Sequence, residues 1–268
     1  MPLRFGQKVQ EVLRCVTMSE RRFACTACGL CCSGLVPLTI REAIDMADTF
    51  PLAMMITPVK PGTRGQAVLE RIGASVVLPP KKKMQLLVNP VSFVPPSMPC
   101  PQLTPENLCG IHKTKPIRCR TMPFYAYKDE DHQTDLLQPR GGWLCDTSDA
   151  APVVYRDHRI VDRADFEAER GRLLDQASAI RRYADLLLKH SPAMMARVAK
   201  AAQTTPTGRV VASFVSYLRY DRGLDLAAFA RAQHSLLRDW DTKTSGNPKM
   251  TEFNAYYREA AVELERYL

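Results

Sequence analysis

The feature that most constrains this chain of 268 residues is a run of four cysteines within eight residues, Cys25-Thr-Ala-Cys28-Gly-Leu-Cys31-Cys32. Two residues between successive cysteines let a turn aim both sulfurs at one ion, and the glycine permits the tight backbone turn that this requires. A hydrophobic core has no need of such a cluster. The run therefore indicates a metal centre, and four more cysteines follow it in the chain: Cys100, Cys109, Cys119 and Cys145.

The cysteines belong to a chain that we expect to fold in a reducing compartment. Its first residues include basic side chains, but no apolar segment and no small-residue cleavage site of the kind that a signal peptide carries. No apolar run is long enough to span a bilayer. We therefore expect a cytoplasmic protein without a membrane span. In that compartment, clustered cysteines bind metal or carry out redox chemistry more often than they form disulfides.

The chain is basic, with a formal net charge of +9. Four thiolates on one zinc ion, or on one oxidised four-iron cluster, carry a net charge of about −2, so part of the basic excess balances such a site. The basic residues are spread along the chain rather than gathered in one block, so nucleic acid is not the expected partner. We expect a protein partner or substrate to contact the helical half of the chain.

The rest of the sequence predicts an α+β fold with two parts. Residues 20–150 are expected to form a cysteine-rich metal-binding or iron–sulfur-binding domain, irregular apart from a few short strands. Residues 160–268 are expected to form a mostly helical region packed against it. The proline-rich stretch 52–99 is expected to be irregular. Short strands are predicted from branched residues bounded by glycine or proline, at 67–72, 75–78, 84–88 and 153–155.

Helix starts are visible at several points. Thr39 and Glu42 have the spacing of a capping box, and Ser191 followed by proline is typical of a helix start. A short helix is also predicted within residues 4–20, with Cys15 as a small buried side chain rather than a ligand. A long helix after residue 164 is predicted by a stripe of apolar residues: Phe166, Leu173, Ala177, Ile180, Ala184 and Leu187.

The cysteine spacing leaves the identity of the metal open. The spacing of Cys25, Cys28 and Cys31 matches the first three ligands of a bacterial ferredoxin run, but Leu35 stands where the fourth cysteine is expected. The fourth ligand then comes from elsewhere, and Cys100 and Cys119 are the candidates. Zinc sites usually pair two short Cys-x-x-Cys knuckles, whereas the later cysteines are separated by long gaps. This favours an iron–sulfur cluster over a zinc ribbon.

The number of centres is open as well. Cys31 and Cys32 are neighbours in the chain, so their side chains point in different directions. Either each faces a different centre, or one is a ligand and the other packs. Without Cys15, eight cysteines remain, enough for two sites of four thiolates, and one site with spare thiols is the competing count. Arg118 and Arg120 flank Cys119, and cations beside a thiol lower its pKa and favour ligation.

These motifs resemble the YkgJ-type cysteine-cluster family, named for its CxxCxxCC run and described as a zinc- or iron-chelating domain. The resemblance covers roughly residues 20–146 and rests on three blocks in order: Phe23-x-Cys-x-x-Cys-Gly-x-Cys-Cys32, Cys100-Pro-x-Leu103, and Cys109-Gly-Ile-His-Lys-Thr-Lys-Pro116-x-x-Cys119-Arg-x-Met-Pro123-Phe. It implies a ligand set of Cys25, Cys28, Cys31, Cys32, Cys100, Cys109 and Cys119, with Cys145 as a further member.

The sequence departs from the family pattern at His112, where tyrosine is usual, so a site of three cysteines and one histidine is an alternative. The same motif occurs in flagellin lysine methylases, which resemble iron–sulfur proteins acting with S-adenosylmethionine. This chain has no G-x-G-x-x-G loop after a predicted strand. Our leading hypothesis is an iron–sulfur protein. The alternatives are a structural zinc-binding interaction module and a metal-dependent protein-modifying enzyme, so catalysis is left open.

Overall fold

A computed structural model describes residues 20–78, 81–204, 208–220 and 223–268. Its larger sheet has five strands in the order β2-β5-β3-β8, with β4 also paired to β5, and all of these pairs are antiparallel. The sheet therefore combines strands from both halves of the chain. Its strands are β2 (Val36–Pro37), β3 (Leu52–Val59), β4 (Ala74–Leu78), β5 (Lys82–Ser92) and β8 (Val210–Ser213).

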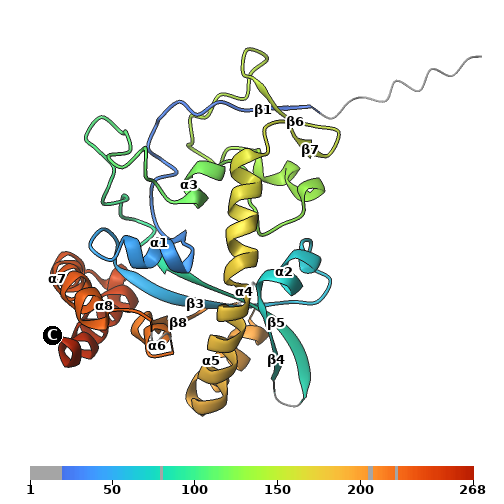
Figure 1. Cartoon of the computed structure of the whole chain (residues 1–268). Coiled ribbons are helices and arrows are strands. Elements are labelled where there is room, and N and C mark those ends of the chain that lie inside the picture. Colours follow the sequence, from blue (N-terminus) through green and yellow to red (C-terminus); the bar gives the residue numbers. More distant parts are fainter. Residues whose placement is uncertain (1–19, 79–80, 205–207, 221–222) are drawn as a thin grey trace, which may run out of the picture.

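A smaller sheet of three strands lies at one end of the molecule, where Figure 1 labels β1, β6 and β7. The residue before Cys25 and the residue after Cys145 also pair beside this sheet. The smaller sheet therefore brings two cysteine-bearing segments to the same place. Its strands are β1 (Arg21–Arg22), β6 (Val153–Arg156) and β7 (Arg159–Ile160).

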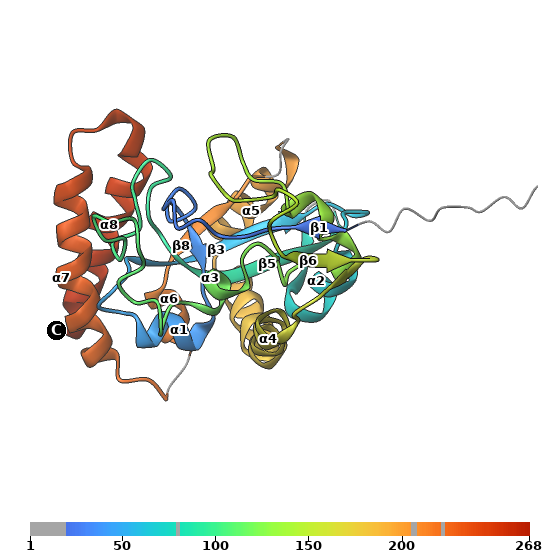
Figure 2. The ribbon, with the colours of Figure 1, turned by 90° about the horizontal axis from the view of Figure 1, so that it is seen from above.

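Helices cover the larger sheet. Figure 2 shows α4 and α5 on opposite sides of its strands, and α7 and α8 packed together at one end. The last third of the described chain is mostly helical, as the apolar stripes predict. The helices are α1 (Ile40–Asp45), α2 (Gln66–Ile72), α3 (Ile117–Thr121), α4 (Ala164–His190), α5 (Pro192–Gln203), α6 (Val215–Leu218), α7 (Leu226–Thr244) and α8 (Thr251–Leu264).

Two apolar clusters form the core. The larger one joins the five-stranded sheet to α5–α8, and its centre is Phe93, whose ring stacks on Phe253 with 4.4 Å between ring centroids. The smaller one lies under α2 and the three-stranded sheet. Helix α4 contributes to both, through Phe166 at its start and Ile180 further along. This arrangement explains the length of the stripe on α4, because one helix supports both clusters.

The structure confirms the α+β class and corrects part of the strand prediction. The strands expected at 75–78, 84–88 and 153–155 are present within β4, β5 and β6. Residues 67–72 are wrong as a strand and form α2, because Val68, Leu69 and Ile72 share one buried helical face. The expectation that 52–99 is irregular is also wrong, since most of it is β3, α2, β4 and β5. The helix predicted within 4–20, with Cys15, lies outside the described residues.

A buried carboxylate on α1 positions the element that carries Cys119. Thr39 and Glu42 form the predicted capping box, and the Glu42 side chain is buried. Its Oε1 accepts a 2.7 Å hydrogen bond from the backbone N–H of Ile117, the first residue of α3, and a second from Arg172 on α4. One carboxylate therefore fixes α1, α3 and α4 relative to one another.

Within the described residues, no helix is long and apolar enough to cross a membrane. The prediction of two domains, 20–150 and 160–268, stays a prediction. The larger apolar cluster nevertheless contains residues of both ranges, and β8 pairs with β3.

Replacing Glu42 by alanine should lower the free energy of unfolding by about 2–4 kcal/mol, because the N–H of Ile117 is left buried without its acceptor. Urea unfolding of the anaerobically purified protein measures this. Asp45→Ala on the same helix removes only an exposed ion pair with Arg41 and should cost less than about 1 kcal/mol. Equal losses in the two variants would contradict the positioning role of Glu42.

Candidate metal centre

The eight described cysteines are all free thiols, and they lie close together although the chain supplies them from distant segments. Seven of them lie in loops, and Cys119 lies on the short helix α3. Backbone pairing between the loops, rather than side-chain packing, brings the segments together. The pairing is antiparallel at three isolated points, between residues 24 and 146, 33 and 99, and 103 and 109.

The first pairing brings Cys145 to the Cys25–Cys31 loop. Ala24 and Asp146 exchange two backbone hydrogen bonds of 2.8 and 2.9 Å, and the Thr26 hydroxyl donates to the carbonyl of Leu144. The pKa of the Cys145 thiol is raised by burial and then by the thiolates around it. We call this set the outer group, and its members are Cys25, Cys28, Cys31 and Cys145.

The second pairing brings Cys100 to Cys32. The N–H of Cys100 donates a 2.8 Å hydrogen bond to the carbonyl of Cys32, and Leu103 pairs with Cys109 in the turn that follows. Cys100 and Cys109 are near enough to Cys119 to raise the pKa of its thiol electrostatically. We call this set the inner group, and its members are Cys32, Cys100, Cys109 and Cys119.

Three of the thiols accept a hydrogen bond from the amide two residues further along the chain. The N–H of Ala27 donates to the sulfur of Cys25 at 3.4 Å, and the amides of Leu30 and Gln102 act in the same way on Cys28 and Cys100. The amides of Leu144 and Leu30 lower the pKa of Cys28. Burial outweighs the amide at Cys100, whose pKa is raised. At Cys28 the amide hydrogen bonds therefore favour the thiolate, the form that binds metal.

The turn between Cys28 and Cys31 depends on a glycine. Gly29 has a φ of +74°, and a Cβ at this position would lie 3.0 Å from the side-chain oxygen of Asn107. Any other residue would therefore strain the backbone and push away the loop that precedes Cys109. This close approach joins the CxxCxxCC loop to the inner group.

The neighbouring thiols of Cys31 and Cys32 are hydrogen-bonded to each other. The hydrogen bond raises the pKa of Cys31, the donor, and lowers the pKa of Cys32, while burial opposes the shift at Cys32. The two thiols therefore mark the point at which the outer and inner groups meet.

The arginines that flank Cys119 are both engaged in ion pairs with α4. Arg118 is buried, donates to Glu169 at 3.0 and 3.3 Å, and lies over the ring of Tyr125. Arg120 pairs with Asp165. Burial raises the pKa of the Cys119 thiol to about 12, against the opposing charge of Arg118. The two arginines thus hold α3 on α4, and each guanidinium group is paired with a carboxylate of that helix.

A cavity of about 590 Å³ opens between the two groups, with Cys31 of the outer group and Cys119 of the inner group in its wall. Its lining also includes Lys128, Arg140 and Trp143, and the Arg140 guanidinium lies 5.4 Å from the centre of the Trp143 ring. Trp143 is half-buried there, consistent with shielding the cysteines from water. The cavity is therefore large enough for a small organic molecule beside the thiols.

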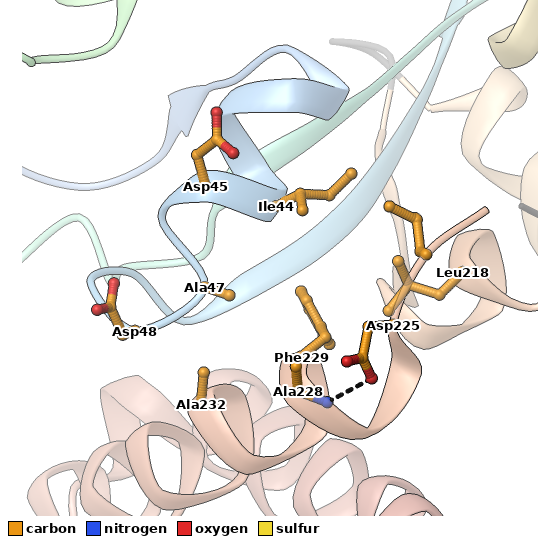
Figure 3. Close-up of a pocket in the computed structure, with 10 residues that line it drawn as sticks. Ile44, Asp45, Ala47, Asp48, Leu218, Asp225, Ala228, Phe229 and Ala232 are labelled. Carbon is orange, nitrogen blue, oxygen red and sulfur yellow. Dashed lines mark hydrogen bonds between the residues drawn. The ribbon is translucent and has the colours of Figure 1, made fainter.

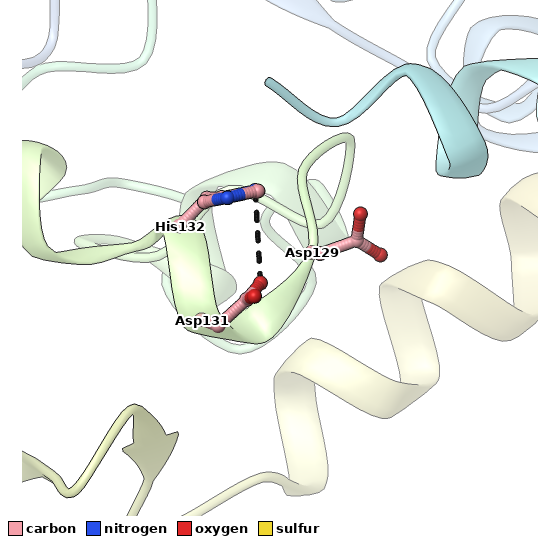
Figure 4. A group of neighbouring side chains, drawn as sticks. All are labelled: Asp129, Asp131 and His132. Atoms are coloured by element: carbon pink, nitrogen blue, oxygen red, sulfur yellow. Dashed lines mark ion pairs between the residues drawn. The ribbon is translucent and has the colours of Figure 1, made fainter.

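Among the described cysteines, no three sulfurs are as close together as the ligands of one ion are. Four thiolates at 2.3 Å from a tetrahedral zinc lie ~3.8 Å apart. Among the described residues, no three cysteine sulfurs lie within 4.8 Å of one another. In the described part of the chain, only one group of three possible ligand atoms lies within that distance. It belongs to Asp129, Asp131 and His132 (Figure 4). That trio is a partly exposed acidic group in which Asp131 pairs with His132, and it contains no cysteine.

A second hollow lies away from the cysteines. Figure 3 shows a groove of about 320 Å³ between α1 and the start of α7, with Ile44 and Phe229 in its wall. Asp225 at its rim accepts a hydrogen bond from the N–H of Ala228 and caps α7. No cysteine or histidine lines this groove. It therefore adds no thiol or imidazole to the candidate metal centre.

The gathered thiols and the α+β scaffold define a cysteine-rich metal-binding protein. Residues 24–138 match the CxxCxxCC family, described as a "putative zinc- or iron-chelating domain". The resemblance predicted from the motifs is thus confirmed, and zinc or iron is the metal that the family description supports. The matched stretch contains seven of the eight described cysteines and stops before Cys145 and the helices α4–α8. No curated protein and no solved structure matches the chain.

Two residues that support the site were not predicted from the sequence. They are Glu42, as the acceptor for the N–H of Ile117, and Glu169, as the partner of Arg118. Glu169 could have been found, since it stands three residues after Phe166 and four before Leu173, on the apolar stripe of α4. A carboxylate on a buried face needs a partner. The amides that donate to sulfur could not be identified from residue types.

Arg118→Met should lower the free energy of unfolding by about 3–5 kcal/mol, because the Glu169 carboxylate is left buried without its cation. Removing both charges in Arg118→Met/Glu169→Met should recover more than half of that loss. Urea unfolding measures both. Arg120→Met, on the other side of Cys119, removes a more exposed pair and should cost about 1 kcal/mol or less. An Arg118 variant no less stable than the Arg120 variant would refute the role assigned to the buried pair.

Proposed function

We propose that this chain is an iron–sulfur protein. The observation that carries the proposal is that eight thiols are gathered in one region while, among the described residues, no three of their sulfurs lie within 4.8 Å of one another. On one ion the sulfurs crowd together, whereas in a cluster each thiolate binds a different iron, so the sulfurs are held further apart. The proposed ligands are Cys25, Cys28, Cys31, Cys32, Cys100, Cys109, Cys119 and Cys145.

The surroundings of the thiols fit such a cluster. A bound iron–sulfur cluster would supply one-electron transfer. The chain's own groups would tune that chemistry, because amide hydrogen bonds to sulfur and nearby cations both raise a cluster's reduction potential. The amides of Ala27, Leu30 and Gln102 are the hydrogen-bond donors, and Arg118 is the nearby cation. A cluster of this kind suits a reducing compartment, and we infer a cytoplasmic location.

A structural zinc module is the weaker proposal. It would require three or four sulfurs to move together until they lie ~3.8 Å apart. The loops could close in this way, because exposed apolar side chains on them indicate little packing: Leu30 is 46% exposed and Leu108 is 53% exposed. Assay of the metal separates the two proposals directly.

Untagged protein purified without oxygen should be brown, with broad visible absorption from sulfur-to-iron charge transfer, and should contain iron and acid-labile sulfide in equal amounts. Absorption spectroscopy and assays of iron, sulfide and zinc on one sample measure this. Protein treated with a strong iron chelator and ferricyanide is the control and should lose both colour and sulfide. Colourless protein with stoichiometric zinc and no iron would refute the proposal.

The cavity between the two groups favours a second function, that of a metal-dependent modifying enzyme acting with S-adenosylmethionine. Trp143 offers an aromatic face to the adenine ring, and Lys128 and Arg140 offer positive charge to the carboxylate. Asp135, also in the wall, is already paired with Arg64. The cosubstrate would then lie beside Cys31 and Cys119, which also line the cavity.

Metal-replete protein should bind S-adenosylmethionine in isothermal titration calorimetry, and Trp143→Ala should weaken that binding about two- to twelvefold through loss of ring stacking. Leu144→Ala is the matched control. The Leu144 side chain is 66% exposed and lies outside the cavity wall. The Leu144→Ala variant should therefore bind S-adenosylmethionine with the affinity of the unaltered protein. Absence of binding to the metal-replete protein would remove this second function and leave the first intact.

A further inference from the structure

We propose that the eight cysteines form two separate centres of four thiolates each, the outer group and the inner group. The inference rests on the proposed function for its ligand set, and it adds the number of centres and the division of the ligands. It is carried by the backbone register of the cysteine loops.

The register places Cys25 opposite Cys145. Ala24 and Asp146 are an antiparallel pair that exchanges both backbone hydrogen bonds. Cys25 follows this isolated pair in one segment and Cys145 precedes it in the other, so the bridge brings the two cysteines close together. One end of the CxxCxxCC run is therefore matched to Cys145.

The other end of the run is matched to a different segment. Ser33 and Pro99 form an antiparallel bridge, and the next pair in that register is Cys32 with Cys100. The 2.8 Å hydrogen bond from the N–H of Cys100 to the carbonyl of Cys32 holds this pair together. Cys25 and Cys32 thus face partners that are 45 residues apart in the sequence.

The remaining cysteines divide in the same way. Cys28 belongs with the first pair, since the amide of Leu144, the residue before Cys145, donates to its sulfur. Cys109 belongs with the second pair, because the turn after Cys100 brings Leu103 opposite it. Cys119 lies within electrostatic reach of Cys100 and Cys109. These placements give each pair further ligands without sharing any.

Cys31 completes the outer group and lies next to the junction. The Cys31 thiol is close enough to raise the pKa of Cys28 and of Cys145 electrostatically, and it donates a hydrogen bond to the Cys32 sulfur. With both centres filled, Cys31 and Cys32 would each be a ligand to its own centre. The two centres would then be linked by the single peptide unit between these residues, close enough for unpaired electrons on the two to interact.

The two groups differ in solvent exposure, so the two centres should differ in how readily oxygen and chelators reach them. Cys25 and Cys31 are exposed, whereas Cys100 packs against the larger apolar cluster and Cys119 is half-buried on α3. Oxygen and chelators should therefore reach the outer centre first. Loss of metal from the unaltered protein is expected to occur in two steps rather than one.

The test compares Cys145→Ser, which opens the outer group, with Cys109→Ser, which opens the inner group. Iron and sulfide are counted per chain after anaerobic purification, and electron paramagnetic resonance spectra are recorded after full reduction. Unaltered protein should hold about eight irons, and each variant should hold about half of that. The spin–spin splitting of the reduced unaltered protein should disappear in both variants. Cys15→Ser is the matched control and should keep the full complement, and circular dichroism should show that all variants are folded.

The outcomes separate this inference from the proposed function. About four irons in unaltered protein, all lost in one variant and fully kept in the other, would overturn the two centres while leaving an iron–sulfur protein. Two zinc ions per chain, one lost in each variant, would support the two centres and overturn the iron–sulfur assignment. One zinc ion per chain would overturn both. If either serine variant fails to fold, Cys25→Ser replaces Cys145→Ser and Cys100→Ser replaces Cys109→Ser, with the same expected halves.

Discussion

The structure around the cysteines depends on two short backbone pairings, one at Ala24 with Asp146 and one at Ser33 with Pro99. Each consists of only one or two hydrogen bonds, yet together they hold the CxxCxxCC loop between segments that are far apart in the sequence. The loops have little apolar packing of their own, and Leu144 is 66% exposed beside Cys145. A bound centre would therefore supply much of the free energy that orders these loops, while the two apolar clusters hold the rest of the chain without it.

Buried charged side chains also hold the elements around the cysteines in place. Glu42 fixes the start of α3, and the pair of Arg118 with Glu169 fixes α3 on α4. Cys119 lies between these two anchors, so its position is set by α1 and α4 rather than by the loops. Buried pairs of this kind contribute little net stability, but removing one partner is costly, which makes them effective at holding a single arrangement. The helical half of the chain thereby takes part in positioning Cys119 in the candidate metal centre.

Much of the fold could be predicted from the sequence, for physical reasons that differ by element. The capping box at Thr39 and the stripe on α4 are local patterns with one structural solution, and both predictions are confirmed. Residues 67–72 were wrong as a strand because Val68, Leu69 and Ile72 fit either period over so short a length, and only tertiary packing selects the helix. The division of the cysteines could not be predicted, because register between distant loops leaves no mark on spacing. The adjacency of Cys31 and Cys32 indicated only that their side chains point in different directions.

The central claim is that the thiols hold iron–sulfur centres at two separate places. Diffraction from anaerobically grown crystals, collected on both sides of the iron absorption edge, tests it most directly because it locates iron without assuming any ligand. The account predicts two iron positions in the anomalous difference map, one among Cys25, Cys28, Cys31 and Cys145 and one among Cys32, Cys100, Cys109 and Cys119. A single iron position that draws ligands from both groups, or a signal at the zinc edge alone, would contradict it.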